Sequence, residues 1–138
     1  MEVKKDMNEK ELKLVEKVLE KGTQLFEQTN YSSKHTVVAG IISETGNIYL
    51  GANCDSVHGT CAEVVAYVNA IMANDKQLKT IVAASARGQG YDRILSPCGN
   101  CRQILMENTP NIDVILCEEG KLKKFPIVQL LPKVYKKK

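Results

Sequence analysis

Two cysteine-bearing segments constrain the fold of this chain most, because their chemistry requires them to meet in space. Residues 60–63 read TCAE and contain Cys61, whereas residues 97–103 read PCGNCRQ and contain Cys98 and Cys101. Three thiolates are a ligand set for tetrahedral zinc, and they leave a fourth position open, as catalytic zinc sites do. The chain must therefore fold so that these two segments, far apart in sequence, lie side by side.

Both segments are predicted to start helices. Ser96 is an N-cap candidate, and Pro97 suits the first helical position. After Cys61, apolar residues recur at helical spacing; they are Val64, Val65, Val68, Ile71 and Met72. The positive end of a helix dipole lowers the pKa of a thiol and favours the thiolate that binds metal. Cys98 and Cys101, three residues apart on a helix, have Cβ atoms about 5–6 Å apart, near enough to share one zinc ion.

Glu63 is the candidate proton carrier. It lies two residues after Cys61, where its carboxylate can take and return the protons of a water that zinc has made nucleophilic. The alternative interpretation is structural, because Thr60 and Glu63 are spaced as a capping box, and a capping box needs no catalysis.

The cysteines allow other interpretations. Cys98 and Cys101 also have the spacing of a redox pair. Cys54, Cys117 or His58 would close the zinc site by supplying a fourth ligand, and the site would then be structural. Cys117 ends an apolar stretch and is therefore expected in the core, whereas Cys54 and His58 lie in the loop before residue 61.

The hydrophobic pattern predicts strands and helices in alternation. Strands are expected at 36–42, 48–50, 81–84, 114–117 and 122–125, and helices at 8–28, 61–73, 97–109 and 126–131, with a loop at 86–95. This alternation predicts one domain over residues 1–138, with a three-layer αβα fold. Its mixed sheet of five strands is expected to carry helices on both faces.

Composition and charge narrow the classes of protein to which this chain can belong. No apolar run approaches the about 20 residues of a membrane span, and the charged N-terminus lacks the apolar core of an export signal, so a cytoplasmic location is expected. Five cysteines in such a chain indicate metal binding or catalysis rather than disulfides. The first 120 residues carry 12 basic and 16 acidic side chains, whereas residues 121–138 hold seven lysines and no acid. The basic tail at 131–138 is therefore expected to be a solvated end.

From residue 31 to residue 135 the sequence resembles the cytidine deaminase family, and within it the branch that contains the blasticidin S deaminases. The residues that carry the resemblance are Cys61–Glu63, Leu95–Gln103 and Leu130–Pro132. The combination of Cys-x-Glu with a later Pro-Cys-x-x-Cys matches the zinc deaminase signature in its three-cysteine form. The resemblance implies the fold of that family.

The resemblance also implies an activity, in which the 4-amino group of a cytosine nucleoside is replaced by a carbonyl oxygen and ammonia is released. The implied ligands of one zinc ion per chain are Cys61, Cys98 and Cys101. Glu63 would shuttle protons, the backbone N–H of Ala62 would bind the O2 atom of the base, and Arg102 is available as a donor to the thiolates. Members of the family are commonly tetramers in pyrimidine salvage, so a homotetramer is expected.

Differences from the family pattern fall where the substrate binds. Nucleoside-specific members have Asn-x-Glu after the first hairpin, which grips the ribose, whereas this chain has Asn53 and Asp55. His35 stands where those enzymes have a Phe near the ligand. Val64 and Tyr135 match the blasticidin branch, and the tail of this family reaches a neighbouring active site. Asn53, Asp55, His35 and Tyr135 are therefore the candidate substrate contacts.

Cytidine or deoxycytidine is the expected substrate, and the cytosine nucleoside antibiotic blasticidin S is the alternative. A base in RNA or DNA is less favoured, because such enzymes need a basic groove and stacking aromatic side chains. This chain has two Phe and no Trp, and the net charge of its first 120 residues is −4. An inactive structural zinc module is the remaining hypothesis.

Overall fold

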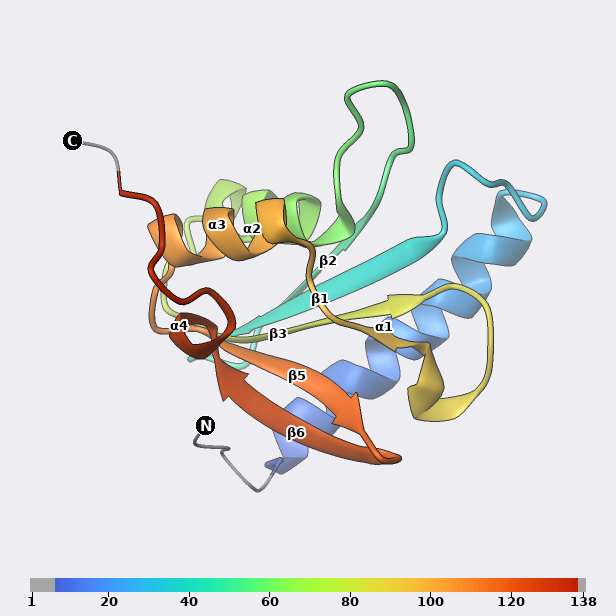
Figure 1. The fold of residues 1–138 in the computed structure, drawn as a ribbon. Helices are drawn as coiled ribbons and strands as arrows, with labels where there is room; N and C mark the ends of the chain where they lie inside the picture. The colour runs from blue at the N-terminus through green and yellow to red at the C-terminus, as the bar shows by residue number, and fades with distance from the viewer. Residues whose placement is uncertain (1–6, 137–138) are drawn as a thin grey trace.

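The computed structural model describes residues 7–136, which form three layers (Figure 1). The middle layer is a mixed six-stranded sheet with the main order β2-β1-β3-β5-β6. Helix α1 covers one face of the sheet, and α2 and α3 lie on the other face. The helices are α1 (Glu9–Gln28), α2 (Ala62–Met72), α3 (Gly99–Asn108) and α4 (Ile127–Leu130). The predicted three-layer αβα fold is confirmed.

The strands are β1 (Val37–Ser43), β2 (Ile48–Ala52), β3 (Leu78–Ser85), β4 (Ile94–Leu95), β5 (Asp113–Glu118) and β6 (Lys121–Pro126). β3 and β5 are parallel, whereas the other pairs are antiparallel. The prediction of five strands was one short, because β4 lies within the predicted loop, after a 3-10 turn at Gly90–Arg93. A strand of two residues is too short to show a periodic pattern.

The central strands are buried on both faces, which explains their nearly continuous apolar sequence. Successive side chains of a strand point to opposite faces. Ile41 and Ile81 therefore pack in the core under α2 and α3, whereas Val38 and Val82 pack in the core under α1. Within residues 7–136 no helix is long and apolar enough to cross a membrane. Of the predicted basic tail, residues 137 and 138 lie outside the described residues.

Two glycines let the helices approach the sheet closely. A Cβ atom on Gly40 would lie 2.5 Å from Cγ2 of Val18 in α1, and one on Gly51 would lie 2.4 Å from the backbone N of Ala66 in α2. The contact at Gly51 is with backbone, which cannot rotate aside as a side chain can. Gly51 therefore sets how closely α2 sits on the sheet, and with it the position of the residues at the start of α2.

The apolar stripe predicted along α2 is not the face that packs on the sheet. Ala62, Ala66 and Ala70 are buried there instead. Val68, Ile71 and Met72 point outward, and Met72 is 81% exposed. Small side chains suit the buried face because α2 lies so close to β2 at Gly51. The larger apolar residues are consequently left on the surface of the chain.

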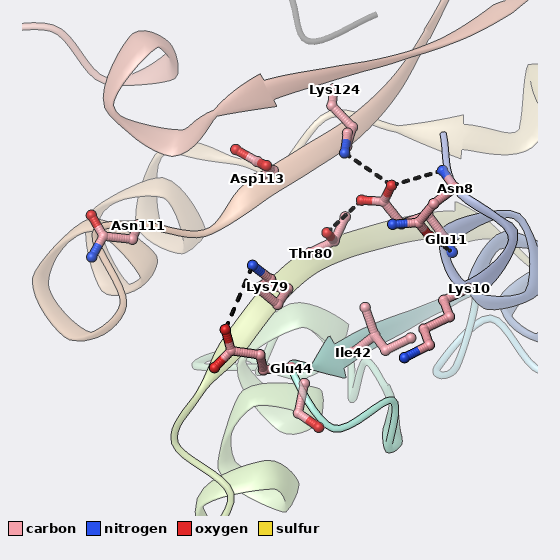
Figure 2. A pocket seen from close by; sticks show the side chains of 11 residues that line it. Asn8, Lys10, Glu11, Ile42, Glu44, Lys79, Thr80, Asn111, Asp113 and Lys124 are labelled. Carbon is pink, nitrogen blue, oxygen red and sulfur yellow. Dashed lines mark hydrogen bonds and ion pairs between the residues drawn. The ribbon is translucent and has the colours of Figure 1, made fainter. Parts of the chain in front are cut away.

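Glu11 fastens the start of α1 to the end of the sheet (Figure 2). It forms a capping box with Asn8, in which each side chain accepts the backbone N–H of the other residue. Its carboxylate also accepts a hydrogen bond from the Thr80 hydroxyl at 2.8 Å and pairs with the Lys124 ammonium at 2.9 Å. The same residues line a cavity of about 380 Å³. Burial acts to raise the pKa of Glu11, but the bonds from Lys124, Asn8 and Thr80 outweigh it and hold the pKa below its ordinary value.

We expect Glu11→Gln to lower the free energy of unfolding by about 1–3 kcal/mol at pH 7, because the half-buried Lys124 loses its anionic partner. Since the pKa of Glu11 is lowered by folding, its contribution is present above the ordinary carboxyl pKa of about 4.3 and is lost as the pH falls through the folded value. Urea unfolding at pH 7 and at pH 3 measures both effects.

The matched control is Glu44→Gln. Glu44 pairs with Lys79 at 3.8 Å, and both side chains are more than half exposed. Exposed pairs contribute about 0–1 kcal/mol, so this variant should unfold nearly like the wild type. A Glu11→Gln protein as stable as Glu44→Gln at both pH values would contradict the role assigned to Glu11.

Candidate functional site

The fold brings the three predicted zinc ligands together. The sulfur atoms of Cys61, Cys98 and Cys101 all lie within 4.8 Å of one another, and those of Cys61 and Cys98 are 3.6 Å apart. Sulfurs bound to one tetrahedral zinc at about 2.3 Å lie about 3.8 Å from each other, so the arrangement fits that metal. Within the described part of the chain, this is the one group of three or more such ligands.

Each sulfur is positioned by a helix start. Cys61 is the N-cap of α2, Cys98 is the N-cap of α3, and Cys101 lies in the first turn of α3. The prediction that Ser96 is an N-cap was wrong by two residues, since the chain stays extended through Pro97 and Cys98. The capping-box interpretation of Thr60 is also wrong, because Thr60 pairs with Cys54 in an isolated β-bridge and α2 has no side-chain cap.

The electrostatics of the sulfurs differ with their surroundings. Burial raises the pKa of Cys101, and the Glu63 carboxylate nearby raises it further. Burial also raises the pKa of Cys61. For Cys98, burial acts in the same direction, but hydrogen bonds from the backbone N–H groups of Cys101 and Asn100 and from the neighbouring thiols bring the pKa below its ordinary value. A dication between the three sulfurs is the charge that stabilises all of them as thiolates.

Glu63 lies in the first turn of α2, beside the sulfurs, and is only 7% exposed. Burial raises the pKa of its carboxyl group, as suits a group that both accepts and donates protons near neutral pH. Glu63, Cys61 and Cys98 line a common cavity of about 290 Å³, close to the lower end of small-molecule sites. Ala62 also lines this cavity, and its N–H, the first of α2, has no carbonyl partner within the helix.

The loop after β2 supplies another side of the cavity, through Asn53, Cys54 and Asp55. The side-chain oxygen of Asn53 accepts the backbone N–H groups of Thr36 and Val37 at 2.7 and 3.0 Å. This carboxamide oxygen is therefore occupied by β1, and only the amide nitrogen of Asn53 remains to meet a ligand. Its one described bond, to the Thr36 hydroxyl, is long at 3.4 Å. Asn53 can therefore contact a ligand only as a hydrogen-bond donor, through its amide nitrogen.

His35 and Tyr135 do not line the cavity of their own chain. The Nδ1 atom of His35 lies 2.8 Å from the carbonyl oxygen of Asn53. Because a carbonyl only accepts, Nδ1 carries the proton and His35 holds the Asn53 loop. Tyr135 is 70% exposed, and its carbonyl oxygen accepts a hydrogen bond from Gln103 at 3.0 Å.

Arg102 does not bond a thiolate among residues 7–136. Its guanidinium donates to the carbonyl oxygens of Pro97 and Leu130 and to the hydroxyl of Ser96. No contact of Arg102 within this range therefore supports its predicted role as a hydrogen-bond donor to the zinc ligands. Leu95 and Ser96, which were not among the predicted site residues, also line the cavity. The sequence could have indicated this, because both residues directly precede the Pro-Cys-x-x-Cys motif that begins at Pro97.

The other candidate ligands stay outside the group of three sulfurs. Cys54 lines the cavity but is exposed, and its sulfur is not within the group. Cys117 is half-buried on β5 and pairs with Leu122 of β6. His58 is exposed in the loop before α2. The three sulfurs with an adjacent cavity thus form an open site rather than a closed four-ligand site.

Comparisons with known proteins agree with this geometry. Residues 12–117 match the family described as "Cytidine and deoxycytidylate deaminase zinc-binding region". A blasticidin-S deaminase of Bacillus cereus is 34% identical over 137 residues, which cover 94% of this chain and 95% of that protein. A cytidine deaminase of Sporosarcina psychrophila is 30% identical over 130 residues, which cover 89% of this chain and 92% of that protein.

Solved structures show the same fold. A cytidine deaminase of Bacillus anthracis superimposes with a TM-score of 0.68 at 23% identity, covering 93% of this chain and 90% of that one. A cytidine deaminase of Mycobacterium tuberculosis gives a TM-score of 0.66 at 20% identity, covering 88% of this chain and 97% of that one. At such identities the likeness concerns the fold alone.

We expect Cys101→Ser to lose most of its bound zinc, because two thiolates and a hydroxyl are a much poorer ligand set than three thiolates. Zinc in the purified protein, measured by atomic absorption, should fall from about one ion per chain to a small fraction. Cys54→Ser is the matched control and should keep its zinc, since the Cys54 sulfur lies outside the group of three. Zinc loss in Cys54→Ser equal to that in Cys101→Ser would contradict this ligand set.

Proposed function

We propose a function from one premise, that this chain belongs to the cytidine and deoxycytidylate deaminase family. It is a zinc-dependent hydrolytic deaminase, and its substrate is a cytosine nucleoside, whose 4-amino group leaves as ammonia. The observation that carries this proposal is the buried carboxyl group of Glu63 in one cavity with the cysteine sulfurs.

Each residue of the site has a task in this reaction. Cys61, Cys98 and Cys101 hold the zinc ion, which when bound supplies a water activated for attack on a ring carbon at neutral pH. Glu63, whose pKa is raised by burial, takes a proton from the attacking water and delivers it to the ring nitrogen N3. It then takes the proton of the hydroxyl group now on C4, where the carbonyl forms, and passes it to the amino group, which leaves as ammonia. The N–H of Ala62 donates to O2 of the base and fixes the ring at the start of α2.

The substrate contacts are proposed from the walls of the cavity. Asp55 lines it, and no bond to its carboxylate is described within residues 7–136, so it is suited to accept a sugar hydroxyl. The amide nitrogen of Asn53 would donate to the same sugar, while His35 keeps Asn53 in position through their 2.8 Å bond. Tyr135 lies after α4, where its side chain is exposed and its carbonyl oxygen is bonded to Gln103 of α3, so it would reach the ligand only in the cavity of a neighbouring subunit.

We also propose that the enzyme is a cytoplasmic homotetramer in pyrimidine salvage. Support for association comes from the outer face of α2, where Val68, Ile71 and Met72 are exposed, because neighbouring exposed apolar side chains mark protein–protein contact sites. Light scattering tests this part, and a single species with the mass of one chain would contradict it. Fractionation of the producing cells tests the location.

Glu63→Gln is the variant that separates catalysis from structure. It keeps the size of the side chain and removes its ability to carry protons, so we expect zinc content to stay unchanged and kcat to fall by about 100-fold or more. Ammonia release and zinc content measure the two effects on the same sample. Turnover like that of the wild type would contradict the role of Glu63, and a change in stability alone would favour a structural role.

A substrate panel decides the specificity. We expect cytidine and deoxycytidine to be deaminated with the highest kcat/KM, since the sugar hydroxyl is the partner proposed for Asp55. Blasticidin S is the second candidate, supported by the similarity to the Bacillus cereus enzyme over nearly the whole chain. Loss of the cytosine absorbance follows each compound directly. A kcat/KM for blasticidin S far above that for cytidine would reverse the order, and turnover of none would contradict the proposed function.

A further inference from the structure

Arg102 joins two segments that are distant in sequence. Its Nε–H donates to the carbonyl oxygen of Pro97 at 2.9 Å, and one terminal nitrogen donates to the Ser96 hydroxyl at 2.7 Å. The other terminal nitrogen donates to the carbonyl oxygen of Leu130 at 2.7 Å. Leu130 is the last residue of α4, and helix C-termini leave such carbonyls without a partner inside the helix.

The segment that Arg102 holds forms one wall of the substrate cavity. Leu95 and Ser96 line this cavity together with Cys61 and Glu63. Leu95 and Pro97 also line a second, smaller space together with Glu63 and Val114. The N-terminal end of this wall is held by other contacts, since β4 pairs with β3 and Arg93 donates to the backbone carbonyl oxygens of Ser85 and Leu19. At the other end, which leads into α3, the bonds from Arg102 to Ser96 and Pro97 hold the wall.

The geometry of the guanidinium, rather than its charge, accounts for this arrangement. Within residues 7–136 Arg102 has no ion pair, and all three of its acceptors are neutral oxygens. A planar guanidinium directs its N–H groups to several acceptors at fixed angles, whereas a lysine ammonium is a single point charge on a flexible stem. Lysine at this position would keep the charge and lose the simultaneous contacts.

From these contacts we infer that Arg102 is a positioning residue, which holds the Leu95–Pro97 wall of the cavity against the substrate by anchoring it to the end of α4. This inference rests on the proposed function, because it assigns the wall a part in binding the nucleoside. It differs from a role on the zinc ligands, since the metal should bind equally well without the three contacts. The substrate would be held less firmly, which affects KM more than kcat.

The test compares Arg102→Lys with Arg87→Lys. Arg87 is a matched control because it is exposed, does not line the cavity and packs on the ring of Phe26 at 4.9 Å. For Arg102→Lys we expect a KM for cytidine raised about 10-fold, with kcat within about threefold and zinc content unchanged. Ser96→Ala, which removes one of the three bonds, should raise KM by a smaller factor. Arg87→Lys should behave like the wild type.

Amide hydrogen exchange of residues 94–98, followed by mass spectrometry in the zinc-loaded proteins, gives a readout that needs no turnover. We expect faster exchange in Arg102→Lys than in the wild type or in Arg87→Lys. Equal KM and equal exchange in the two lysine variants would overturn the inference. Loss of zinc in proportion to activity in Arg102→Lys would also overturn it, because a direct role on the thiolates predicts that result. If the wild type deaminates no cytosine compound, the proposed function fails, and the exchange rates still decide whether Arg102 holds the wall.

Discussion

The site depends on one electrostatic constraint, which is that several groups able to carry negative charge are packed together away from water. Cys101 and Glu63 are buried, and Cys61 is half-buried beside them. Burial raises the pKa of all three, since charge is costly in a poorly hydrated environment. A bound dication would remove this cost for the thiolates, while Glu63, which is not one of the three sulfur ligands, would remain free to exchange protons with a substrate. One arrangement thus explains both metal binding and acid–base chemistry.

The fold meets this constraint by placing two helix starts next to each other. The N-terminus of α2 brings Cys61 and Glu63, and the N-terminus of α3 brings the other two sulfurs. Gly51 allows α2 to lie directly on β2, which fixes the first pair relative to the sheet. The Leu95–Pro97 wall before α3 is held by Arg102, which links the carbonyl oxygen of Pro97 to that of Leu130 at the end of α4. Elements from most of the chain therefore converge on one cavity.

The features that could be predicted from the sequence are those that depend on the spacing of residues close to one another in the chain. The strand pattern was predictable because it lies within a few residues, and the grouping of Cys61, Cys98 and Cys101 was predictable because two local motifs together resemble the zinc deaminase signature. The partners of Arg102 were not, because Leu130 comes from a distant segment. The buried face of α2 could not be predicted for a related reason: the sequence shows that Val68 and Met72 are apolar, but not that α2 approaches Gly51 so closely that alanines are buried there. The occupied oxygen of Asn53 likewise depends on β1 and not on its own motif.

The most direct test of the account is the coordination of zinc in the loaded wild-type protein, measured by X-ray absorption fine structure. The account predicts three sulfur atoms at about 2.3 Å and one oxygen or nitrogen at about 2.0–2.2 Å, which is the open position that a hydrolase needs. A fit that requires four sulfur atoms would contradict it, because the fourth position would then be closed and the zinc structural. A fit with fewer than three sulfur atoms would contradict the assignment of Cys61, Cys98 and Cys101 as the ligand set.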